Sequence, residues 1–216
     1  MAITLATGTI AAIASTYATS KTMSAITNAA EAVATLEGSH GVVQGDYIEV
    51  TSGWDRLNNR IVRVKSVATN DIVLESINTT STTNYPAGTG AGTVRRITAW
   101  TNLSQITSGI SVAGGDINFA DVTTIVDTVQ KQIPTTRSPV SVKLPFYDDP
   151  SLSWYSIVNG VADSATATGF RMSFPNGSKL VSNSYWSIQT VPTIEDSTLR
   201  GTVDVAFAAP PVRYST

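Results

Sequence analysis

Short apolar runs, broken at intervals by turn-forming residues, dominate the pattern along this chain. Between residues 41 and 99 four such runs are separated by the pairs Gly45-Asp46, Asn58-Asn59 and Asn70-Asp71. Runs of this length bounded by Gly, Asn and Asp are typical of strands joined by tight turns. The pattern predicts a hairpin-rich β unit over residues 41–96, which includes a long exposed loop at 76–93.

The first 40 residues carry a weaker signal. Residues 1–20 are small and hydroxylated without a clear period, so they are predicted to form an N-terminal arm that is ordered only when it docks. From Met23 to Leu36 apolar residues recur every three to four positions, and Gly38 follows them. This spacing favours a short helix, and an extended segment is the alternative.

Residues 97–216 show a more ordered succession of elements. Asp149 and Pro150 are predicted to cap a helix over residues 150–166, because an Asp side chain accepts from the first free amides and Pro fits the first helical position. Apolar side chains from Trp154 onward fall on one stripe, so this helix should lie on a sheet. Strands are predicted around it, at residues 117–119, 140–144, 170–174, 180–181, 185–191 and 199–207.

Asn176-Gly177 gives the clearest turn signal in the chain. This dipeptide favours a two-residue hairpin turn in which both central residues take positive φ. Alternating apolar residues precede it from Phe170 and follow it from Leu180. A β-hairpin is therefore predicted with its turn at Asn176 and Gly177.

Composition favours sheet and limits the chemistry. The chain has 31 Thr and 24 Ser among 216 residues, and charged residues are 14%, below the roughly 25% of ordinary soluble domains. With no Cys, neither a disulfide framework nor a thiol nucleophile is available. The formal net charge is −2 without a basic cluster, which argues against tight binding of a nucleic-acid backbone.

Catalytic candidates are few. His40 is the only histidine, and no G-x-S-x-G element accompanies it, so it is interpreted as a loop residue rather than part of a hydrolase triad. The pair Asp148-Asp149 suits an acid/base or cation site, but the predicted helix start also explains both residues. No catalytic residue, cofactor or metal ligand is predicted.

Two other features of the sequence could be interpreted as ligand-binding sites. Gly88, Gly90 and Gly92 lack the Lys and the strand-loop-helix context of a phosphate-binding loop, so a flexible loop is predicted. Trp54, Trp100, Trp154 and Trp186 could line a sugar-binding face, but large aromatic residues are more often core or interface residues.

Several phrases of the second half resemble the major tail tube proteins of long-tailed, non-contractile bacteriophages. In that family a strand and long loop carry a phrase similar to Asp121-Val122-Thr123-Thr124 followed by Ile133-Pro134, with Thr135 here where Gly is frequent. A strand, a helix and a hairpin phrase similar to Phe174-Pro175-Asn176-Gly177-Ser178 come next. The closing strand, residues 202–207, is also similar, so the resemblance covers residues 98–216.

This resemblance implies a mainly β fold, a tail-tube-type β-sandwich or barrel with one flanking α-helix and long loops. Residues 97–216 would form the tube-like sandwich, and the unit at 41–96 would be an insertion or part of a variant sandwich. The implied function is structural and non-enzymatic: a virion protein assembled in the host cytoplasm into stacked hexameric rings, which form the conduit for DNA ejection.

The implied partners are further copies of the chain, the tape-measure protein, and the tail completion, terminator and tip proteins, with no membrane. DNA would pass through the lumen without specific binding, and Asp196 and Asp204 are candidate lumen-facing acids. The loop at 76–93 and the N-terminal arm are expected to reach the neighbouring ring. The alternative function is a carbohydrate- or receptor-binding β module of the tail tip or baseplate.

Overall fold

The computed structural model describes residues 7–215 of the chain. In this range the fold is mainly β, with a single helix, as predicted. In chain order the elements are β1 (Ile10–Tyr17), β2 (Lys21–Ile26), β3 (Val33–Leu36), β4 (Tyr47–Ser52), β5 (Arg60–Ala68), β6 (Asp71–Leu74), β7 (Gly92–Asn102), β8 (Ser111–Ala113), β9 (Ile117–Asp121), β10 (Gln132–Arg137), β11 (Ser141–Tyr147), α1 (Ser153–Ser164), β12 (Thr168–Ser173), β13 (Lys179–Ile188), β14 (Thr193–Glu195), β15 (Thr198–Phe207) and β16 (Val212–Tyr214).

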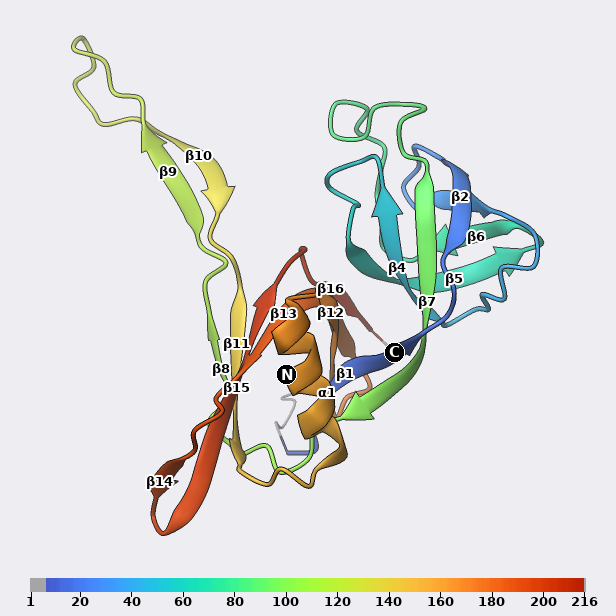
Figure 1. The fold of residues 1–216 in the computed structure, drawn as a ribbon. Helices are drawn as coiled ribbons and strands as arrows, with labels where there is room; N and C mark the ends of the chain where they lie inside the picture. Colours follow the sequence, from blue (N-terminus) through green and yellow to red (C-terminus); the bar gives the residue numbers. More distant parts are fainter. Residues whose placement is uncertain (1–6, 216) are drawn as a thin grey trace.

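Six strands close into an antiparallel barrel, seen at the upper right of Figure 1. Their order is β2-β3-β6-β5-β4-β7, and β7 pairs back with β2. Because the ring of strands is closed, none of them leaves a free edge within it. Alternate side chains fill the interior, including the fully buried Met23, Ile48, Val50 and Val94.

The second unit is an open antiparallel sheet in the order β7-β1-β12-β13-β15-β11-β8. Helix α1 lies across β13 and reaches β1 and β7, so it covers one face of this sheet (Figure 1). Trp154 and Val158, four residues apart, are its fully buried residues. The Trp154 ring meets Phe146 of β11 edge to face at 5.0 Å, which fixes the helix on the sheet.

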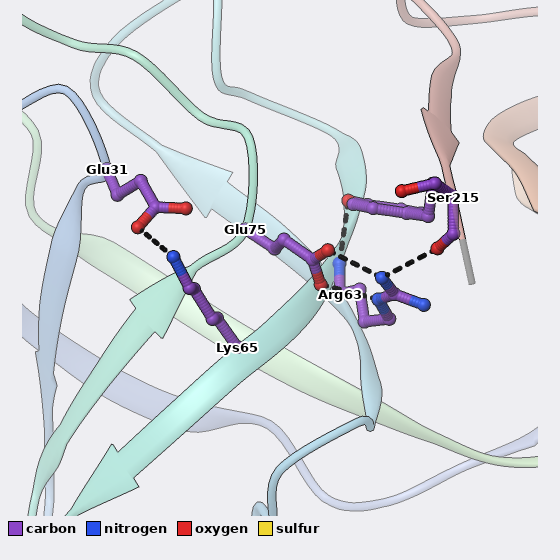
Figure 2. A network of polar contacts seen from close by, with 6 residues as sticks. Glu31, Arg63, Lys65, Glu75 and Ser215 are labelled. Carbon is purple, nitrogen blue, oxygen red and sulfur yellow. Dashed lines mark hydrogen bonds and ion pairs between the residues drawn. The ribbon is translucent and has the colours of Figure 1, made fainter.

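The two units share a strand and pack against each other. The first part of β7 pairs with β4 in the barrel, and its second part pairs with β1 in the open sheet. At the C-terminal end, the Arg63 backbone N–H donates to the Tyr214 hydroxyl at 2.8 Å. Figure 2 shows the Arg63 guanidinium bound to both carboxylate oxygens of Glu75 at 2.5 Å and to the Ser215 carbonyl at 3.2 Å, with the barrel ion pair of Glu31 and Lys65 beside them.

The N-terminal predictions need correction. Residues 10–17 are not an arm: they form β1, a central strand of the open sheet, and residues 1–6 lie outside the described residues. The segment from Met23 to Leu36 is extended, as β2 and β3, and not helical. Apolar spacing alone could not decide this, because a three-to-four spacing also arises when two short strands each turn one face to a barrel interior.

The helix start is also corrected. Helix α1 begins at Ser153, and Leu152 occupies the cap position without a side-chain hydrogen bond to the helix. Asp149 instead accepts from the Ser151 N–H at 3.0 Å and the Ser151 hydroxyl at 2.6 Å, and these bonds hold the pKa of Asp149 below its ordinary value. Asp149 and Pro150 therefore organise the turn before the helix.

The predicted hairpin is confirmed, with a different turn. It joins β12 to β13, which continues unbroken to Ile188 instead of splitting into two strands. Gly177 has φ +81°, whereas Asn176 is not among the residues with positive φ. The Phe174 N–H donates to the Ser178 carbonyl and the Gly177 N–H to the Phe174 carbonyl, both at 2.9 Å. This is a longer loop with one left-handed residue.

Candidate functional site

A two-stranded arm leaves the body of the molecule. Strands β9 and β10 pair only with each other among the described strands, and Figure 1 shows them projecting well beyond the open sheet. All six residues of β10 and most of β9 are exposed. The arm gains little burial within the described part of the subunit, and exposed apolar surface of this kind is typical of interaction sites.

Glycine allows the arm to leave the sheet between β8 and β9. Gly114 has φ +81°, and a Cβ there would lie 1.9 Å from the Pro139 carbonyl oxygen of the opposite segment. Two effects therefore exclude a side chain at this position: the positive φ of the backbone, and the clash of a Cβ with the Pro139 carbonyl oxygen. The ladder continues past it, because the Ser138 N–H donates to the Asp116 carbonyl at 2.9 Å.

The phrase at residues 121–124 organises the end of the arm. Asp121 accepts from the Thr123 N–H at 2.8 Å and from the Thr123 hydroxyl, and these bonds hold the pKa of the Asp121 carboxyl below its ordinary value. Asp127 pairs with Lys131 and accepts from the Thr124 N–H at 2.8 Å, and the Lys131 contact is the main cause of its lowered pKa. Carboxylates that accept backbone amides in this way fix a loop's conformation.

The loop that these bonds hold is apolar on its outside. Ile125 is fully exposed and Val126 is 83% exposed, and Val129, Phe119 and Ile133 extend the apolar surface along the arm. The sequence reasoning missed this surface, although Ile125-Val126 between two family-like phrases was a visible signal. It assigned contacts with the neighbouring ring to the loop at 76–93 and to the N-terminal arm. Within one subunit this loop packs on the barrel, where Asn28 donates to the Thr79 and Tyr85 carbonyls.

A second hairpin projects at the other end of the sheet. Strands β14 and β15 form it, and Figure 1 places it at the end of the open sheet opposite the arm. Ile194 is 80% exposed on this hairpin. Glu195 and Asp196 lie beside it and share one cation, with Arg200 at 3.1 Å from Glu195 and 3.9 Å from Asp196.

The two candidate lumen acids occupy different places. Asp204 lies in the middle of β15, where Val203 and Val205 face the helix side and Asp204 faces the opposite side of the sheet. Its carboxylate lies 3.7 Å from Lys143 Nζ on β11, its cross-strand neighbour. Asp196 lies on the turn between β14 and β15, with φ +48°, and is not brought together with Asp204.

The residue considered as a catalytic candidate, His40, holds loop backbone in the structure. The His40 Nδ1 accepts from the Val42 N–H at 3.1 Å and its Nε2 donates to the Thr69 carbonyl at 2.9 Å, so both ring nitrogens hold loop backbone. Among residues 7–215 no group of three His, Cys, Asp or Glu side chains could hold a metal ion. In the same range, no helix is long and apolar enough to cross a membrane.

The tryptophans are core residues, as interpreted from the sequence. Trp54, Trp154 and Trp186 are at most 5% exposed, and Trp100 is partly buried beneath the Arg171 guanidinium. Their rings are therefore not free to stack on a sugar.

Comparison with known proteins agrees with the resemblance seen in the second half. No curated protein matches the chain. The model of the phage tail tube protein family matches residues 52–216, which include the second half of the barrel, every strand of the open sheet except β1, helix α1 and both projecting hairpins. That match covers most of the chain, and the chain therefore belongs to the phage tail tube protein family, as a structural component of the virion tail.

Proposed function

We propose that this protein is the repeating subunit of a phage tail tube, which assembles itself as stacked hexameric rings that enclose the conduit for DNA ejection. It acts without catalysis, through contacts between copies made in the host cytoplasm. Its other partners would be the tape-measure protein inside the tube and the completion, terminator and tip proteins at its ends. The family match supports the tail tube assignment.

The β9–β10 arm is the observation that carries the assembly proposal. Exposed Ile125, Val126 and Val129 form an apolar end on a ribbon that pairs with no other strand among residues 7–215. Burying such side chains in a neighbouring copy contributes about 25 cal/mol per Å² of apolar area, whereas leaving them in water favours uncontrolled association. A neighbouring subunit is the partner that this surface fits.

The open face of the sheet supports the conduit part of the proposal. The face opposite α1 presents Asp204 and Lys143 next to each other, so their charges largely cancel. A near-neutral polar wall does not release counterions from DNA, and DNA would therefore slide along it without being held. Asp204 would face the lumen, and Asp196 would lie at the end of this face.

Assembly of the purified protein tests the proposal. Electron microscopy of the wild type should show tubes of uniform width with six-fold symmetry in projection. The double variant Ile125→Ser/Val126→Ser should stay folded, judged by circular dichroism, and should lose at least tenfold in sedimentable polymer. The matched control is Val43→Ser, which changes an exposed apolar residue on the barrel and should leave polymer yield unchanged.

Three other outcomes would each contradict one part of the proposed function. A wild-type protein that remains a small oligomer at high concentration would favour the binding-module alternative. Rings of another symmetry would overturn the hexamer, and full polymer yield from the arm variant would remove the arm from assembly.

A further inference from the structure

A groove lies at the base of the arm, between the barrel and the open sheet. Its volume is about 650 Å³, and its apolar lining comes mainly from Pro139, Val140, Phe207, Pro210 and Pro211. The barrel side contributes Arg56 and the arm side contributes Arg137. The groove is therefore an apolar trough with a cation on each of two separate elements.

Both cations lack a partner within the described part of the subunit. The guanidinium groups of Arg56 and Arg137 are exposed and make no ion pair or hydrogen bond with residues 7–215. Most other arginines here do have partners, such as Arg95 with Glu49 and Arg63 with Glu75. Two free guanidinium groups beside an apolar trough favour an occupant that is both apolar and acidic.

The β14–β15 hairpin tip has that chemistry. Ile194 and Leu199 are exposed apolar side chains, and Glu195 and Asp196 share the single cation Arg200. Asp148 lies at the base of the same tip, where its N–H donates to the Leu199 carbonyl at 3.0 Å. The tip thus carries an excess of negative charge around an apolar centre.

The groove and the tip lie at opposite ends of one strand, β15. The ten-residue strand β15 begins at Thr198 in the tip and ends at Phe207 in the groove. At about 3.3 Å per residue the two surfaces are roughly 30 Å apart, so a subunit cannot place its own tip in its own groove. A head-to-tail contact between two copies can join them, and such contacts continue as filaments.

We propose that the β14–β15 tip of one copy docks into the groove of the next copy along the tube, with Ile194 against Phe207 and the prolines and with Glu195 and Asp196 facing Arg56 and Arg137. This inference rests on the proposed function and adds which surfaces meet between stacked rings. The arm is a poorer occupant, because it leaves the sheet beside the groove, at Arg137 and Ser138, and its end presents mainly the apolar side chains of Ile125, Val126 and Val129.

Cysteine cross-linking tests this contact directly, because the chain contains no Cys. One full-length chain carries Ser138→Cys at the groove and a second carries Ser197→Cys at the tip. A short bis-maleimide added to their mixture should give a 138–197 cross-linked dimer as the main product on a denaturing gel. The matched control replaces Ser138→Cys by Ser66→Cys, an exposed barrel position, and should give at least fivefold less dimer.

Charge reversal provides the second measurement. Arg137→Glu on the groove chain should lower the dimer yield at least fivefold, and Glu195→Lys on the tip chain should restore it. Equal cross-linking at Ser66, or no rescue by the paired reversal, would overturn the tip-groove contact. If specific 138–197 dimers form but no tubes do, the tip-groove contact is supported and the proposed tube is contradicted. If tubes form without these dimers, the tube is supported and the tip-groove contact is contradicted.

Discussion

The side-chain amide of Asn183 donates a hydrogen bond to Glu49 Oε1 at 3.0 Å across the interface between the barrel and the open sheet. The two residues are 134 positions apart in sequence, and both are buried, at 0% and 8% exposure. Glu49 also accepts from Arg95 Nη2 at 2.5 Å and from Arg95 Nε at 3.0 Å. This carboxylate therefore fixes β4 and β7 of the barrel to β13.

Glu49→Ala should lower the free energy of unfolding by about 2–3 kcal/mol, because it leaves the buried Asn183 amide and the Arg95 guanidinium without their acceptor. Urea denaturation measures the change. The matched control is Glu37→Ala, which removes an exposed, solvent-screened ion pair with Lys21 and should lower the free energy of unfolding much less than Glu49→Ala does. Equal losses in the two variants would contradict the role of Glu49 at the interface.

Two glycines should respond oppositely to substitution by alanine. Gly177→Ala should lower the free energy of unfolding by about 1–2 kcal/mol, since an L-residue is strained at φ +81°. Gly160→Ala, inside α1 with open space around its Cβ, should raise it by about 0.5–1 kcal/mol. Thermal unfolding of both variants gives the comparison, and the same sign for both would refute the backbone argument.

Removing residues 1–20 should prevent folding. The deletion takes away β1, which pairs with β7 on one side and β12 on the other and buries Ile13 completely. Circular dichroism and gel filtration of the truncated chain should show an unfolded or aggregated protein. A control chain that starts at Thr7 retains β1 and should fold, whereas a folded monomer from the longer deletion would contradict the place of β1 in the sheet.

Acid should loosen the end of the arm. The folded-state pKa values of Asp121 and Asp127 are below the ordinary 3.8, so their stabilising contribution is present above that pH and is lost as the pH falls through the lower folded-state values. NMR titration should show the Thr123 and Thr124 amide shifts changing with midpoints below 3.8. Asp121→Asn should abolish the change at Thr123, and midpoints at or above 3.8 would contradict these bonds.

Asp204→Lys should slow DNA passage without blocking tube assembly. The substitution places a second cation beside Lys143 on the open face of the sheet, and a basic wall gains affinity for the phosphate backbone by releasing counterions. Ejection rates from phage that carry the variant measure the effect. Asp163→Lys on the exposed side of α1 is the control, and equal ejection rates in both phages would argue against Asp204 as a lumen residue.

Local sequence signals predicted the elements that depend on neighbouring residues. The pair Asn58-Asn59 separates two strands as expected, whereas the turn predicted at Asn70-Asp71 lies one residue earlier, at Thr69-Asn70, because Asp71 already pairs in β6. Gly177 turns a hairpin because few other residues adopt its backbone conformation. The apolar stripe of Trp154 and Val158 marked the helix. The ordered phrases of the second half were enough to indicate the family. Each phrase lies within one turn or hairpin, so it can be recognised from neighbouring residues alone.

Tertiary structure alone decided what depends on distant pairing. Extended β2 and β3 replace the predicted helix because Met23 and Leu36 complete a barrel whose closing partner, β7, comes some 70 residues later. The hydrogen bond between Glu49 and Asn183 and the projection of the β9–β10 arm have no local sequence signature for the same reason. Propensity and turn chemistry act over a few residues, whereas barrel closure and the surfaces left open for other copies are settled by which distant strands pair.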